Sequence, residues 1–109
     1  VLDKHGNTVV SLKEDNASFF RIDVAKGKAW GCVAMGESSR GLGEKAKTNP
    51  AFVNGLTVTS KGRILPNPGA IPIVQNNEII GSVGISGDKG ENDEKICIES
   101  VKKNGFETK

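Results

Sequence analysis

The stretch Gly62-Arg63-Ile64-Leu65-Pro66-Asn67-Pro68-Gly69-Ala70-Ile71-Pro72-Ile73 is followed shortly by Glu78-Ile79-Ile80-Gly81-Ser82-Val83-Gly84-Ile85-Ser86-Gly87. The prolines interrupt the first apolar segment, because proline lacks the N–H that a sheet ladder requires. The second segment alternates with a period of two, which predicts a strand. After Ile80, one face of this strand carries only Ser and Gly. Such a face leaves room beside the sheet, either for a helix or for a ligand.

The segments around this stretch predict an alternation of strands, turns and helices. Turn residues at 4–7 predict a hairpin between strands 1–3 and 8–13, and Gln75-Asn76-Asn77-Glu78 predicts a second tight turn. Apolar residues at steps of three and four predict a helix over 19–35, ending at Gly36. The remaining expected elements are a loop or short helix at 38–47, a helical turn at 49–53, strands at 56–60, 63–65, 71–74 and 79–86, and a helix from 91 to 103.

This order predicts one α+β domain covering residues 1–109. Strands joined by short turns must be antiparallel neighbours. We therefore expect an antiparallel sheet of about five strands with helices packed on it.

Composition narrows the classes of partner. The net charge is +2, and the five aromatic residues are not interleaved with basic ones, so we do not expect nucleic-acid binding. No apolar run reaches the ~20 residues of a membrane span, and no leader peptide is visible. We expect a cytoplasmic protein, although a chain that starts at Val1 rather than Met leaves secretion open. Cys32 and Cys97 are expected to be free, buried thiols.

Few residues suggest chemistry. His5 is the only histidine and lies in a predicted turn, so neither a catalytic triad nor a zinc site is expected. Carboxylates between 88 and 94 suit a hard cation, but stabilisation of the helix N-terminus explains them better. Lys28 flanks the apolar stripe of the first helix. It is either solvated, or it reaches an acidic ligand group in the space left by Ser82, Gly84 and Ser86.

Four motifs together carry a family resemblance. They are Asp3-x-x-Gly6, Ile22-Asp23-Val24-Ala25 with Lys28-Ala29 and Gly36, the proline loop from Gly62 to Ile73, and Glu78-x-x-Gly81-x-x-Gly84-x-Ser86-Gly87 followed by Asp93-Glu94. In this combination the chain resembles the GlcG/HbpS-like haem-binding family, and also the C-terminal domain of PduO-type proteins. The match covers nearly the whole chain.

The resemblance implies a profilin-like α+β fold, self-association from dimers to octamers, and binding of haem or of a corrinoid such as cobalamin. Family members usually begin with a helix before the first strand, and this chain has none. Side chains suited to bind iron are limited to His5, Cys32, Met35 and Cys97, and we assign none of them as an axial ligand.

The first hypothesis is therefore a non-enzymatic, oligomeric domain that binds a small molecule or tetrapyrrole. The expected contacts are Lys28, Pro66, Pro68, Gly69, Ser86, Gly87 and Asp93. A second hypothesis is an enzyme or accessory protein that acts on a small organic acid, with Lys28 and Asp93 in its pocket. A third is a purely structural assembly domain, in which Ala25 and Ala29 fill the Ser/Gly face.

Overall fold

The computed structural model describes all 109 residues and contains one antiparallel sheet of three strands. The strands are β1 (Leu2–Asp3), β2 (Ala70–Gln75) and β3 (Glu78–Gly84), in the order β1-β3-β2. Asn76 and Asn77 join β2 to β3 with positive φ angles of 53° and 65°, which asparagine tolerates better than most residues. This confirms the hairpin predicted from the alternating stretch.

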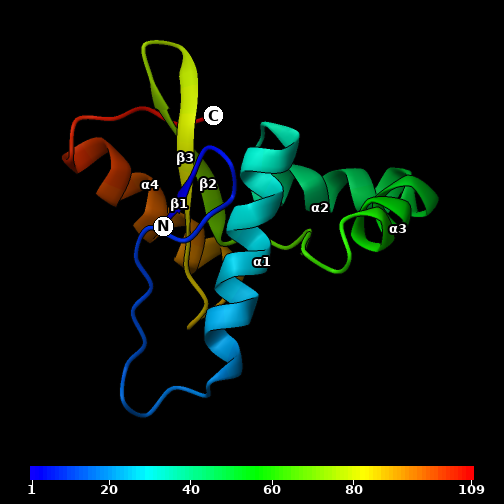
Figure 1. Cartoon of the computed structure of the whole chain (residues 1–109), viewed down its shortest axis with the longest axis horizontal. Helices are drawn as coiled ribbons and strands as arrows, with labels where there is room; N and C mark the ends of the chain where they lie inside the picture. Colours follow the sequence, from blue (N-terminus) through cyan, green and yellow to red (C-terminus); the bar gives the residue numbers. More distant parts are fainter.

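Two long helices cover opposite faces of the sheet (Figure 1). Helix α1 (Phe20–Met35) packs with Leu2 and Ala70 on one face, whereas α4 (Gly90–Lys103) packs with Ile71 on the other. Gly36 ends α1 with a φ of 72°, as its sequence predicts. The predicted bounds of α1 and α4 each agree with the structure to within one residue.

The predicted strands 56–60 and 63–65 are wrong. Residues 56–59 belong to α3 (Pro50–Thr59), and residues 63–65 form neither a helix nor a strand. The segment 38–47, expected as a loop or short helix, forms α2 (Ser39–Thr48), and α2 and α3 project from the body in Figure 1. Pro50 suits the first helical turn of α3. The hydroxyl of Thr57 lies within donating distance of the carbonyls of Val53, at 3.3 Å, and of Ile64, at 3.1 Å, so this β-branched residue satisfies its polar group from within a helix. The amide of Leu65 donates to the carbonyl of Gly27 in α1 rather than to another strand.

The predicted strand 8–13 is also wrong beyond its first residue. Thr8 makes an isolated bridge with Leu2, and Val9 and Val10 bond to the carbonyl of Val1. Residues 11–13 have no strand opposite them, so their alternating pattern cannot form a ladder. The sheet thus has three strands instead of about five, within an α+β domain as expected. The likeness to profilin stays a prediction. None of the helices is long and apolar enough to cross a bilayer.

Small residues allow α1 to lie close to β3. The hydroxyl of Ser82 donates to the carbonyl of Ala29 at 2.7 Å, and it is fully buried. A Cβ at Gly84 would collide with the carbonyl oxygen of Ala25. At these two positions the Ser/Gly face is filled by the helix, so the room predicted beside the sheet is used for packing.

Gly84→Ala should lower the free energy of unfolding by about 1–3 kcal/mol, because the added methyl group pushes α1 away from the sheet. Gly55→Ala is the matched control. A Cβ there meets nothing within 4 Å in the same chain, so a gain of about 0.5–1 kcal/mol is expected when both variants are measured at a low protein concentration that keeps the chains apart. Urea denaturation measures both, and equal effects of the two substitutions would contradict the close packing.

Candidate functional site

A buried ion pair joins the two long helices beyond the end of β3. Lys28 of α1 is 6% exposed and Asp93 of α4 is 1% exposed, with Nζ and Oδ2 3.7 Å apart. The Lys28 ammonium also donates to the carbonyl of Ile85 at 3.1 Å. Each buried charge requires the other, because an unpaired ion in the interior is strongly destabilising.

The same carboxylate holds the loop that follows β3. Asp93 accepts the backbone N–H of Gly87 at 3.3 Å and that of Asp88 at 3.1 Å. Lys28 and Asp93 together therefore fix residues 85–88. Ser86 lies in this loop, and its hydroxyl accepts a hydrogen bond from Arg21 Nη1 at 3.2 Å.

The proline loop packs against helices rather than facing open space. A Cβ at Gly43 would lie 2.8 Å from the carbonyl oxygen of Pro66, and one at Gly90 would lie 2.7 Å from that of Pro68. Gly69 has a φ of 131°, and a Cβ there would lie 2.6 Å from Lys28 Nζ. Gly69 is thus part of the surroundings of Lys28, while Pro66 and Pro68 contact the N-terminal halves of α2 and α4.

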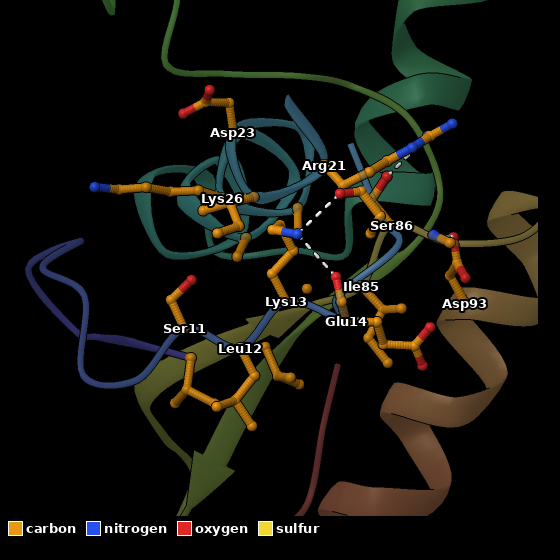
Figure 2. A pocket seen from close by; sticks show the side chains of 18 of the residues that line it. Ser11, Leu12, Lys13, Glu14, Arg21, Asp23, Lys26, Ile85, Ser86 and Asp93 are labelled. Atoms are coloured by element: carbon orange, nitrogen blue, oxygen red, sulfur yellow. Dashed lines mark hydrogen bonds between the residues drawn. The ribbon is translucent and has the colours of Figure 1, made fainter. Parts of the chain in front are cut away.

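A cleft of about 1050 Å³ opens beside the 85–88 loop (Figure 2). Its walls come from residues 8–18, from α1, from the end of β3 and from α4. The apolar part of the lining consists of Val1, Leu2, Val10, Leu12, Ala17, Ile22, Ala25, Ala29, Val83, Ile85 and Ile96. The charged part consists of Lys13, Glu14, Arg21, Asp23, Lys26, Asp88 and Asp93.

The structure brings together some of the expected contacts. Ser86, Gly87 and Asp93 line the cleft, and Lys28 and Gly69 lie directly behind them. Pro66 and Pro68 do not line it. Sequence reasoning missed Arg21 and the whole wall from residues 8–18. The one sequence signal for this part of the cleft was the apolar stripe of the first helix, because Ile22, Ala25 and Ala29 of that stripe line the cleft.

The chain offers no evident site for a bare metal ion. No group of three or more His, Cys, Asp or Glu side chains is arranged to hold one. Cys32 and Cys97 are free and fully buried, as predicted. Burial raises the pKa of each thiol to about 12, so both remain protonated near neutral pH. A protonated, enclosed thiol is a poor metal ligand.

Residues 1–102 match the model of a protein family described as haem degrading protein HbpS-like. The chain belongs to this family. The resemblance inferred from the sequence motifs is therefore confirmed.

Two curated proteins are similar to this HbpS-like chain. An uncharacterized 15.0 kDa protein from the dhaT-dhaS intergenic region of Citrobacter freundii is 29% identical over 97 residues, which are 89% of this chain and 68% of that protein. The corrinoid adenosyltransferase PduO of Salmonella typhimurium is 28% identical over 101 residues. The match covers 93% of this chain but only 30% of PduO.

Solved structures share the fold. A PduOC:heme complex has a TM-score of 0.87 at 26% identity, covering 98% of this chain and 77% of that one. Klebsiella pneumoniae protein ORFY has a TM-score of 0.82 at 26% identity, covering 93% and 69%. A double mutant of Streptomyces reticuli HbpS has a TM-score of 0.80 at 24% identity, covering 95% and 68%, and supports the fold alone.

Lys28→Met should lower the free energy of unfolding by about 3–5 kcal/mol, because it leaves the Asp93 carboxylate buried without its counter-ion. Lys47→Met is the control. Lys47 pairs with Glu44 on the exposed surface of α2, and its loss should change stability by less than about 1 kcal/mol. Urea denaturation compares them, and similar small losses would show that Lys28 does not hold the loop.

Proposed function

We propose that this chain is a haem-binding domain that holds the macrocycle in the cleft beside the 85–88 loop. The observation that carries the proposal is the cleft itself, which combines an apolar lining with charged groups at its edge. The family description and the heme complex of the similar PduOC domain support haem as the ligand. Cobalamin has weaker support, because the chain spans only 30% of the corrinoid adenosyltransferase it matches.

The lining fits the organic part of haem. Ile22 and Ala25 of α1 face the cleft together with Val83 of β3, Ile85 and Val10. Apolar contacts of this kind stabilise a bound ring by roughly 25 cal/mol for each Å² removed from water. The cleft volume lies near the upper end of ordinary ligand sites, about 300–1000 Å³.

The lining does not supply the usual iron ligands. It contains no His, Cys, Met or Tyr. His5 borders a separate cavity of about 150 Å³ with Trp30, and both cysteines are fully buried. Bound haem would supply a redox-active iron, while the residues of the cleft would bind and orient the macrocycle. Affinity should then come from the porphyrin rather than from a protein–iron bond.

Titration with haemin should shift the Soret band at micromolar protein concentrations. Metal-free protoporphyrin IX should bind with a dissociation constant within about tenfold of that for haemin, because the cleft offers the iron no strong ligand. Cobalamin, followed by its visible absorption, serves as the corrinoid comparison. An unchanged Soret band together with no cobalamin binding would refute a tetrapyrrole ligand, and a large preference for haemin would refute binding without an iron ligand.

We also propose that the domain self-associates through α3. This helix has no charged residue, and among the helices and strands it contacts α2 alone. Phe52 is 50% exposed and Val58 is 77% exposed, and a Cβ at Gly55 between them would meet nothing within 4 Å. Such an uncharged apolar surface suits pairing with its own copy about a two-fold axis. A purely structural assembly role would rest on this surface and on the Ser/Gly face filled by α1.

Light scattering coupled to size exclusion should give a mass above the 11.5 kDa of one chain. Phe52→Glu and Val58→Lys should each shift the mass toward one chain, because a charge cannot be desolvated in that contact. Leu12→Lys is the control, since Leu12 is 90% exposed and lies in the segment before α1 rather than in α3. A monomeric wild-type protein would refute self-association, and a shift only with Leu12→Lys would assign it to another surface.

The remaining hypothesis is an enzyme or accessory protein acting on a small organic acid. Lys28 and Asp93 would be its polar groups. Both are engaged with each other and with the 85–88 loop. The geometry therefore favours binding over catalysis.

A further inference from the structure

We infer that Arg21 makes the cleft selective for ligands that carry a carboxylate, and that Ser86 positions Arg21 for this role. Where the ligand is haem, this inference rests on the function proposed above. Arg21 is the second residue of α1 and lies at the edge of the cleft. Figure 2 shows its side chain beside Ser86, joined by a dashed hydrogen bond.

The donors of Arg21 are mostly unused. A guanidinium has five N–H donors, and the structure engages one of them, on Ser86 Oγ at 3.2 Å. No carboxylate lies within ion-pairing distance of Arg21, although four carboxylate residues line the cleft. The bond to Ser86 orients the planar group and leaves most of its donors available to a ligand.

The four carboxylates that line the cleft differ in whether they are free to pair with Arg21. Asp93 is paired with Lys28 and accepts two backbone amides, and Asp88 accepts the amide of Lys89 and the side chain of Asn92. The other two, Glu14 and Asp23, are exposed and form no ion pair within the cleft. The carboxylates of Asp93 and Asp88 therefore already accept hydrogen bonds from other groups of the protein.

The other cations of the lining are less suited to recognise a carboxylate. The ammonium group of Lys13 already donates hydrogen bonds to the carbonyls of Glu14 and Ala17. Lys26 points away from Arg21 in Figure 2 and has no protein partner that would orient it. Arg21 alone combines a fixed orientation with free donors, and a guanidinium can bind both oxygens of a carboxylate at once.

The apolar lining then determines how a ligand lies. Val10, Leu12 and Ile96 add apolar surface to the cleft, while Arg21 and Ser86 form a polar edge. A flat apolar molecule with an acid group at one edge meets both requirements. Haem, with two propionates on one edge, belongs to this class, and so do smaller aromatic acids.

Haemin and haemin dimethyl ester form the first pair of probes, since the ester removes only the acid groups. The second pair is 2-naphthoic acid and methyl 2-naphthoate, which share the naphthalene ring system and differ only in whether the carboxylate is free. Absorbance and fluorescence titrations give the four dissociation constants. The wild-type protein should prefer the acid of each pair by about tenfold or more, as expected for charge-assisted hydrogen bonds.

Arg21→Met should reduce this preference to within about threefold and leave binding of the uncharged probes unchanged. Arg21→Lys should retain part of the preference, because it keeps the charge without the planar fork. Ser86→Ala should weaken the preference without abolishing it. Lys26→Met is the control and should keep the wild-type preference. All three sites are at least partly exposed, and circular dichroism checks that each of the four variants is folded.

The outcomes separate the two proposals. If neither porphyrin binds but the naphthalene pair shows an Arg21-dependent preference, haem binding is refuted and acid selection stands. If both porphyrins bind equally well, haem binding stands and acid selection is overturned. Acid selection is also overturned if Arg21→Met keeps the wild-type preference, or if Lys26→Met loses it.

Discussion

The buried pair of Lys28 and Asp93 is the interaction on which the rest of the structure depends. Its two partners come from helices on opposite faces of the sheet, and they meet past the end of β3. Because neither charge can be left alone in the interior, α1 and α4 must adopt their positions together. The carboxylate then fixes the backbone of the following loop, and the loop places Ser86 opposite Arg21. The same ion pair therefore positions the two helices and the loop at the edge of the cleft.

Close approach of backbones is the second constraint. Ser82 and Gly84 give up side-chain volume so that α1 can lie against β3, and Gly69 does the same beside Lys28. The proline loop fits in the same way against Gly43 within α2 and Gly90 at the start of α4. The sequence left open whether these small residues make room for a helix or for a ligand, and at Ser82 and Gly84 the structure uses them for helix packing. The open volume of the cleft borders Val83 and Gly84 at the end of β3 as well as the loop that follows.

The sequence predicted the elements whose signals are local and consistent. The β2–β3 hairpin has both a period of two and an Asn-Asn turn, and α1 has both a stripe and a stop at Gly36. It failed at 56–60, where β-branched residues favour a strand but the hydroxyl of Thr57 bonds within a helix. The prediction of a strand at 8–13 was also wrong. A strand needs a neighbouring strand to pair with, and the local sequence does not reveal whether the fold provides one.

The candidate site, like the fold, was predicted from the sequence only where its residues lie in local motifs. Lys28, Ser86, Gly87 and Asp93 lie in motifs, and the structure brings them together. Arg21 lies outside the quoted motifs, and its role depends on a contact with a residue 65 positions away. Long-range pairs of this kind leave no periodic trace in a single sequence.

The segment from residues 9 to 18 forms one wall of the cleft without any helix or strand of its own. Its first residues are hydrogen-bonded to Val1, and Ser18 at its end accepts the amides of Phe20 and Arg21. Lys13 donates only to carbonyls within the segment itself. The opposite wall is built on the sheet and two helices. One wall can therefore change in sequence and length without disturbing the core, whereas the other cannot. Relatives with this fold could diverge in ligand size by exchanging that segment alone, and a designed protein could use it as a graft site.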